Sequence, residues 1–148
     1  MSLSQQIQSD YLKAYKAKDA LRLSVLRHLK TAATNLSVDL KRDVNDDELL
    51  DVVLKQAKQR QDSIEQFKAG GRDDLAAKEE AELVILKDYL PQVLEGDELE
   101  KAVNEAIQKT GATAARDMGK VMASLMEDYK GRLDGKAVSA LVRSKLQG

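Results

Sequence analysis

Residue types that carry nucleophilic, acid–base or metal chemistry are scarce in this sequence of 148 residues. The chain has no cysteine, which removes thiolate nucleophiles, thiolate zinc sites, iron–sulfur clusters and disulfides together. Its one histidine, His28, lies at the edge of a leucine-rich helical pattern, where we interpret it as a half-buried packing residue rather than a catalytic base. We therefore predict no catalytic residues, no metal site and no cofactor, and we expect no catalysis by the chain alone.

Three further motifs could suggest chemistry but have simpler structural explanations. Asp46-Asp47-Glu48 begins a predicted helix, where the helix dipole favours negative charge, and Glu79-Glu80-Glu82 lies on a helix whose other face is apolar. We interpret both clusters as solvated surface rather than as paired carboxylates or a metal cage. The stretch Gly131–Lys136 superficially resembles a phosphate-binding loop, but its glycines are one residue too close, Ala137 replaces the hydroxyl residue and no strand precedes it.

The remaining candidate is a set of basic residues near the C-terminus. From Arg116 onward seven Lys and Arg stand against four Asp and Glu, a local charge of +3 in a chain whose net charge is -1. Arg116 and Lys120 are one helical turn apart, while Lys130, Arg132 and Lys136 flank a glycine turn. This pattern predicts sequence-independent contacts to phosphates, with little base stacking because aromatic residues are only 3% of the chain. An ordinary solvated face is the alternative interpretation.

The elements that position these residues are predicted to be helices throughout, because the chain is rich in Ala, Leu, Lys, Glu and Gln and has one proline. We predict an all-α fold with an N-terminal four-helix bundle-like subdomain over residues 1–93 and a small three-helix subdomain over residues 94–148. Apolar spacing and caps place the helices as follows: Leu3 to about Lys18, Asp19 to about Lys41, Asn45 to Gly70, Asp73 or Asp74 to before Pro91, and three more that begin at Asp97, Thr113 and Asp134.

Two expectations concern packing and location. Met118, Met122 and Met126 recur at i, i+4 and i+8, which predicts one buried stripe. The longest apolar run is Leu83–Leu86, far too short to span a membrane, and the N-terminal residues are polar. We therefore expect a cytoplasmic protein that has no membrane partner.

Four short motifs in the sequence, taken together, resemble one known family. They are Arg22–Arg27, a stretch that runs from Ala81-Glu82 to Asp88–Pro91, Asp117–Met122 and Lys130–Lys136. The chain is similar to the free-standing YqeY proteins, whose C-terminal half resembles the tail domain of GatB, a subunit of the glutamine-dependent aspartyl/glutamyl-tRNA amidotransferase. The resemblance implies an all-helical protein and a C-terminal subdomain that helps to hold tRNA.

On this resemblance the tRNA-backbone candidates are Arg116, Lys120, Lys130, Arg132 and Lys136, with Arg143 next. The chain has no counterpart of the catalytic domain of GatB, nor of an amidase. The first hypothesis is therefore a tRNA-binding or tRNA-amidotransferase-associated accessory protein that is not catalytic alone, with a possible protein partner at the N-terminal bundle. The alternatives are a helical protein–protein adaptor without a nucleic-acid role, and a component of a glutamine-dependent carbon–nitrogen ligase (amidotransferase) assembly.

Overall fold

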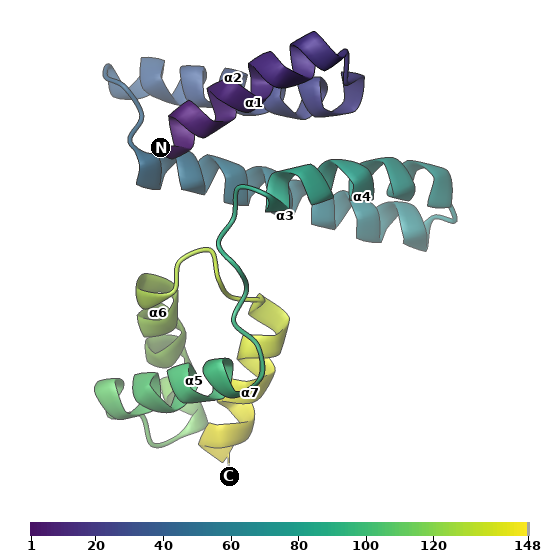
Figure 1. Cartoon of the computed structure of the whole chain (residues 1–148). Helices are drawn as coiled ribbons and strands as arrows, with labels where there is room; N and C mark the ends of the chain where they lie inside the picture. The colour runs from purple at the N-terminus through teal and green to yellow at the C-terminus, as the bar shows by residue number, and fades with distance from the viewer. Residues whose placement is uncertain (148) are drawn as a thin grey trace. The chain divides into compact units, whose positions relative to one another are not determined.

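The computed structural model describes residues 1–147, and these residues form helices and connecting loops without a strand (Figure 1). The predicted all-α class is therefore confirmed. In chain order the elements are α1 (Leu3–Ala17), α2 (Ala20–Leu40), α3 (Asp46–Ala69), α4 (Asp73–Lys87), α5 (Gly96–Thr110), the short 3-10 helix η1 (Ala115–Asp117), α6 (Met118–Asp128) and α7 (Gly135–Gln147).

The chain divides into two compact units, Met1–Leu90 and Pro91–Gly148. The first unit contains α1 to α4 and the second contains α5, η1, α6 and α7. Each unit has its own apolar core, so each is described by itself below.

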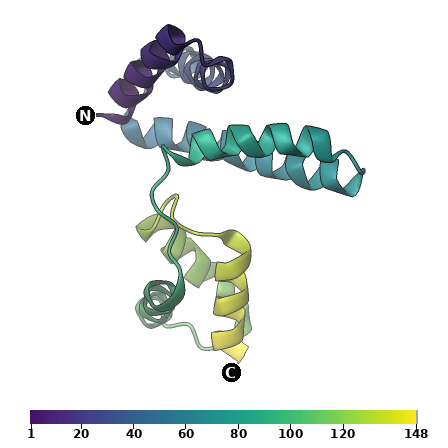
Figure 2. The same cartoon turned by 45° about the vertical axis from the view of Figure 1, so that its right-hand side comes forward.

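The first unit consists of two helical hairpins, α1–α2 and α3–α4. Figure 2 shows α2 nearly end-on while α3 and α4 are seen along their length, so the hairpins cross instead of aligning as in a regular antiparallel bundle. Side chains from three helices fill the crossing point: Val25, Leu26 and Leu29 of α2, Val53 of α3 and Leu86 of α4 are all fully buried. Because this core is aliphatic, the crossing depends on the shape of branched side chains rather than on stacked rings.

Local sequence signals explain where most of these helices begin. The Asp19 carboxylate accepts a hydrogen bond from the Arg22 amide at 3.1 Å, and Asn45 and Glu48 form the predicted capping box with bonds of 2.8 and 3.1 Å. The predicted cap at Asp97 is wrong, because α5 begins one residue earlier, at Gly96, where the backbone has φ +56°. A glycine adopts this conformation readily, so the chain turns into the helix before it reaches the aspartate.

The core of the second unit lies between α5, α6 and α7. On α6, Val121 and Leu125 are fully buried, whereas Met118 and Met122 are only half-buried and Met126 is 58% exposed. The predicted methionine stripe is therefore wrong at its C-terminal end. The buried face of α6 is centred on the branched residues, and Met126 lies about 100° around the helix from Leu125.

A line of polar contacts links three helices of the first unit. The Gln56 amide donates to the His28 carbonyl at 3.2 Å, an Arg60 NH group donates to the Gln56 carbonyl at 3.4 Å, and Arg60 Nε donates to the Glu82 carboxylate at 3.2 Å. The Arg60 and Glu82 side chains are only 10% and 11% exposed. Glu82 was expected on a solvated face, and that expectation is wrong because a buried arginine on α3 pairs with it. The His28 side chain, expected to be half-buried, is exposed.

The C-terminal end of this unit is attached to its first helix. The Tyr89 hydroxyl donates to the Asp10 carboxylate at 2.6 Å. Burial and the neighbouring carboxylate both disfavour the phenolate, so the pKa of Tyr89 is raised well above its ordinary value. The segment that follows α4 is therefore held against α1.

We predict that Glu82→Ala lowers the free energy of unfolding by about 3 kcal/mol, because it leaves the Arg60 guanidinium buried without its counter-ion. Chemical denaturation followed by circular dichroism measures the change. The matched control is Glu80→Ala, which removes the exposed Lys68–Glu80 pair between the same two helices and should leave the denaturation midpoint nearly unchanged. Equal midpoint shifts in the two variants would contradict a special role for the buried pair.

Candidate nucleic-acid interface

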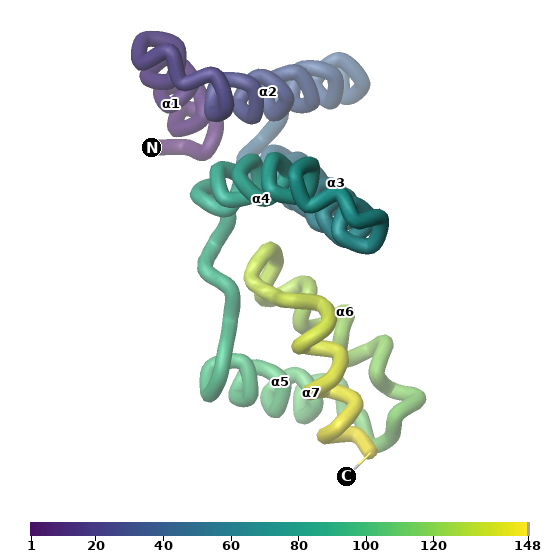
Figure 3. The backbone as a smooth tube through the Cα atoms, turned by 90° about the vertical axis from the view of Figure 1, so that its right-hand side faces the viewer, coloured from purple at the N-terminus to yellow at the C-terminus, as the bar shows by residue number. Residues whose placement is uncertain are grey.

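The antiparallel path of α6 and α7 separates the basic candidates into two groups. The two helices contact each other, and η1 contacts α7, so the beginning of α6 lies beside the end of α7 (Figures 1 and 3). Arg116, Lys120 and Arg143 therefore belong to one end of the unit, and Lys130 and the turn that follows it belong to the other. Since α6 has 11 residues, the two ends are about 16 Å apart along its axis.

At the first end, Asp117 organises the entry into α6. Its carboxylate accepts the backbone N–H groups of Thr113 at 3.0 Å and Ala114 at 3.3 Å. The bond from Thr113 is the main cause that lowers the pKa of Asp117, and the nearby charges of Lys120 and Arg116 act in the same direction. Thr113 was predicted to cap this helix, but it donates its backbone N–H to Asp117, which directly precedes α6. Arg116 and Lys120 are both exposed.

At the second end, Arg132 has a structural role. Its Nε donates to the Gln92 carbonyl at 3.0 Å, and its own carbonyl accepts the Leu94 amide at 2.8 Å. The preceding Gly131 adopts φ +78°, which lets the chain turn at this point. Arg132 was predicted to contact phosphate, but these bonds engage it with the segment that enters the unit.

The backbone at the beginning of α7 is also engaged. Asp134 Oδ1 accepts the Lys136 amide at 3.1 Å, and the Asp134 carbonyl accepts the Val138 amide at 2.9 Å. Asp134 therefore caps α7 as predicted, and its carboxylate occupies a donor that a phosphate would otherwise need.

α7 has the most favourable charge pattern for a polyanion. Among the helices within residues 1–147 it is the one without an Asp or Glu, and it has three cations. Val138 and Val142 are fully buried, which leaves Lys136 and Arg143 exposed two turns apart on the opposite face. Lys145 is paired with Glu100 of α5 at 3.1 Å.

A larger basic excess lies outside the predicted site. Residues 1–45 contain eight Lys and Arg against four Asp and Glu, a local charge of +4. The predicted site omits this region because the prediction rested on the charge beyond residue 115 alone. Counting charge helix by helix would have found it.

Within residues 1–147, no three His, Asp or Glu side chains gather into a group that could hold a metal ion. None of the helices in this range combines the length and apolar character needed to cross a membrane.

Known proteins are similar to this chain over nearly its whole length. The family described as Yqey-like protein matches residues 4–146. A protein named Altered inheritance of mitochondria protein 41, mitochondrial, from Pyrenophora tritici-repentis is 33% identical over 143 residues, which cover 93% of this chain and 77% of the relative. The protein of the same name from Saccharomyces cerevisiae is 31% identical over 133 residues, which cover 89% of this chain and 70% of that relative.

The names of these relatives correct one expectation. Both describe a mitochondrial protein, and the cytoplasmic location expected from the sequence is therefore wrong by this comparison. The expectation depended on polar N-terminal residues and on the lack of a long apolar run. Neither property distinguishes the cytoplasm from a mitochondrial compartment.

We predict that Arg132→Ala loosens the segment that enters the second unit. Loss of the bond to the Gln92 carbonyl should speed amide hydrogen exchange at Leu94 about fivefold, the equivalent of one ordinary hydrogen bond. Arg132→Lys keeps the charge but loses the Nε donor, so it should show the same faster exchange. Wild-type exchange at Leu94 in Arg132→Lys would mean that the positive charge of residue 132, and not its Nε hydrogen bond, holds the segment.

Proposed function

The chain belongs to the Yqey-like protein family, and from this premise we propose that it is a tRNA-binding accessory protein that contacts RNA phosphates through α7. The observation that carries the proposal is the absence of acidic residues from α7 together with the exposure of Lys136 and Arg143 on one face. The similarity of the C-terminal motifs to the GatB tail domain supports tRNA as the ligand.

The spacing of these two cations suits a helical backbone. Seven residues of α-helix rise about 10.5 Å, so Lys136 and Arg143 can reach phosphates that are separated along an RNA strand or across a groove. Arg116 and Lys120 extend the positive surface beyond the C-terminal half of α7, where η1 contacts it. Such contacts recognise the shape and charge of the RNA and not its base sequence. The affinity is therefore predicted to fall steeply as the salt concentration rises.

We predict that the Lys136→Ala, Arg143→Ala double variant loses most of its affinity for purified tRNA. The slope of log affinity against log salt should fall by about 1.8, since each lost phosphate contact removes about 0.9. A salt titration by fluorescence anisotropy, with duplex DNA of equal phosphate content alongside, measures both quantities.

The control for this prediction removes the same charge from an acidic helix. Lys101→Ala, Lys109→Ala on α5 should change the affinity and the slope little, because α5 carries four Asp and Glu. Equal losses of tRNA affinity in the two double variants would show that the affinity depends on the net charge of the chain and would refute a specific contact by α7. Binding that ignores salt would also refute phosphate contact by α7.

Docking of a protein partner on the first unit is a second candidate function, favoured by a groove between α2 and α3. The groove has a volume of about 610 Å³, and its apolar lining is Ala32, Leu36 and Val52. Gln56 also lines it, and in the described part of the chain the Gln56 Oε1 atom is buried and accepts no hydrogen bond. A partner helix with an apolar stripe and one side-chain donor would satisfy both features.

We predict that Leu36→Arg releases such a partner, because a charged side chain would have to be buried in the apolar part of the groove. Co-purification of one identified protein with the wild-type chain, measured by quantitative mass spectrometry, provides the readout. Val84→Arg, on an exposed position of α4, is the matched control and should retain the partner. Retention of the partner by both variants would exclude the groove.

A further inference from the structure

We propose that the outer face of α1 and the α1–α2 turn form a second RNA-contacting surface, in which lysines bind phosphates and one tyrosine stacks on an unpaired base. The residues of this α1 surface are Lys13, Tyr15, Lys16 and Lys18. The inference rests on the proposed RNA-binding function and adds a contact on the other unit of the chain.

The charge of the α1–α2 region supports this surface. Its nearby acidic residues are engaged elsewhere: Asp10 accepts the Tyr89 hydroxyl, and Asp19 caps α2 and lies 3.7 Å from Arg22 Nε. Among residues 1–147, none of the three lysines of the α1 surface has a carboxylate oxygen within 4.0 Å. Their charges are therefore not neutralised by the protein, and a polyanion is the complementary partner.

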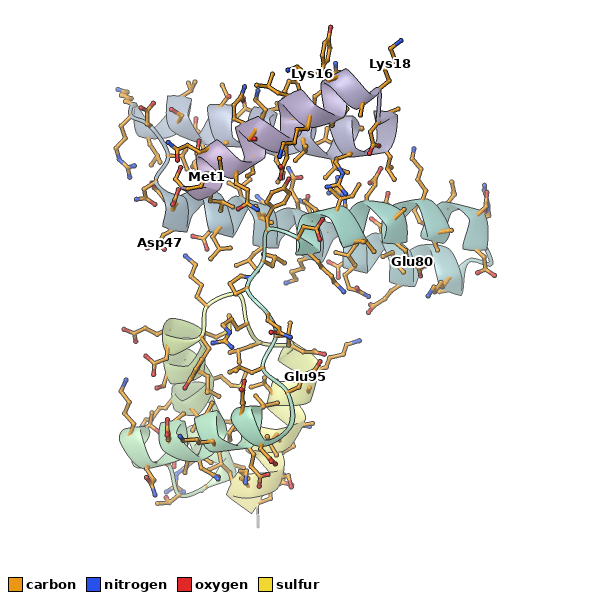
Figure 4. All side chains as sticks on the ribbon, viewed as in Figure 1. Met1, Lys16, Lys18, Asp47, Glu80 and Glu95 are labelled. Atoms are coloured by element: carbon orange, nitrogen blue, oxygen red, sulfur yellow. The ribbon has the colours of Figure 1, made fainter. Side chains whose placement is uncertain are left out.

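Helix geometry places Lys16 between Lys13 and Tyr15 around the exposed side of α1. Lys13 and Lys16 are three residues apart on α1, which corresponds to about 5–6 Å between Cβ atoms on a helix surface. Tyr15 lies about 100° around the helix from Lys16, and Lys18 follows the helix as its left-handed C-cap. Ala14 faces the core and is buried. Figure 4 shows Lys16 and Lys18 at the C-terminal end of α1, on the side of the hairpin that faces away from α3 and α4. All four residues of the α1 surface are exposed.

Tyr15 has the most exposed ring of the aromatic residues, with 62% of its surface accessible. Tyr89 is buried, Tyr11 lies beneath the ammonium group of Lys30 at 4.1 Å, and Phe67 is partly buried. An exposed ring beside lysines is the arrangement that binds unpaired nucleotides by stacking and phosphate contact. The low aromatic content predicted little stacking on bases, but one accessible ring beside the lysines is sufficient to stack on one base.

A single-stranded RNA fits this patch better than a lipid surface does. An interfacial helix needs a continuous apolar face to enter the headgroup region. The apolar face of α1, which includes Ile7 and Ala14, is already buried in the protein core. What remains exposed is mainly positive charge with Tyr15 and Leu12.

Lys18 provides a variant that separates binding from folding. Lys18 and Lys41 are the two non-glycine residues with positive φ within the described chain, at +56° and +59°, and they end α1 and α2 respectively. Glycine is favoured in this left-handed conformation, so replacing either lysine by glycine should not weaken the fold. The two variants remove the same charge from equivalent backbone positions about 30 Å apart along α2.

The experiment measures binding of the full chain to labelled tRNA and to a 12-nucleotide oligouridylate. We expect Lys18→Gly to lower both affinities severalfold while Lys41→Gly does not, with neither variant lowering the melting temperature. Tyr15→Ala should lower oligouridylate affinity about tenfold, and Tyr15→Phe should restore it, because the ring alone is needed for stacking. Lys13→Ala, Lys16→Ala should reduce the salt slope for the oligouridylate by about 1.4.

The outcomes distinguish this inference from the proposed function. If the α1 variants bind both RNAs as the wild type does, while Lys136→Ala, Arg143→Ala loses tRNA binding, the α1 surface is refuted and the α7 proposal stands. If only the α1 variants lose binding, the α1 surface stands and the α7 proposal fails. If the wild-type chain binds neither RNA, both fail.

A vesicle arm tests the lipid alternative with the same variants. The probe is a phosphatidylglycerol vesicle, and we expect weak binding that changes little in Tyr15→Ala. Vesicle binding that is lost in Tyr15→Ala, with oligouridylate binding unchanged, would overturn the RNA proposal and assign this face to anionic lipid.

Discussion

The first unit depends on a buried ion pair that fixes how α3 and α4 lie against each other. A buried arginine and carboxylate must remain together, because either one alone would be left without a partner in a dry environment. The Arg60–Glu82 pair therefore sets the register of the α3–α4 hairpin on which α2 crosses. The polar contact from Gln56 to the α2 backbone connects that crossing to the same pair. These contacts link the backbone of α2 to the same part of α3 that pairs with α4.

The sequence predicted what is decided by local chemistry. The capping box at Asn45, the aspartate caps at Asp19 and Asp134, and the glycine stop at Gly111 involve residues only a few positions apart, so the pattern contains both partners. It could not predict what depends on distant residues. Glu82 is buried because of Arg60, 22 positions away, and so its role is invisible in the local pattern.

The candidate site was predicted with the same strengths and weaknesses. Charge and the family resemblance identified Lys136 and Arg143, which are both exposed on α7. They could not show that Arg132 bonds to a carbonyl 40 positions earlier. A positive residue beside a glycine turn gives the same sequence pattern whether it binds a phosphate or a backbone carbonyl. The whole-chain charge of -1 was also a poor guide. Charges act over roughly 8 Å in physiological salt, so separate regions of opposite sign do not cancel at a binding surface.

The short segment between the units has a consequence for ligands that are polymers. Tyr89 is held by Asp10 on one side and Leu94 by Arg132 on the other, so a few residues, from Leu90 to Val93, separate two firmly attached points. Fully extended, that stretch reaches about 18 Å. A polymer engaged by one unit therefore meets the other at an effective concentration in the millimolar range, and modest affinities combine into avidity. Under the two RNA-binding proposals, neither unit needs to be a strong binder for the chain to stay on an RNA.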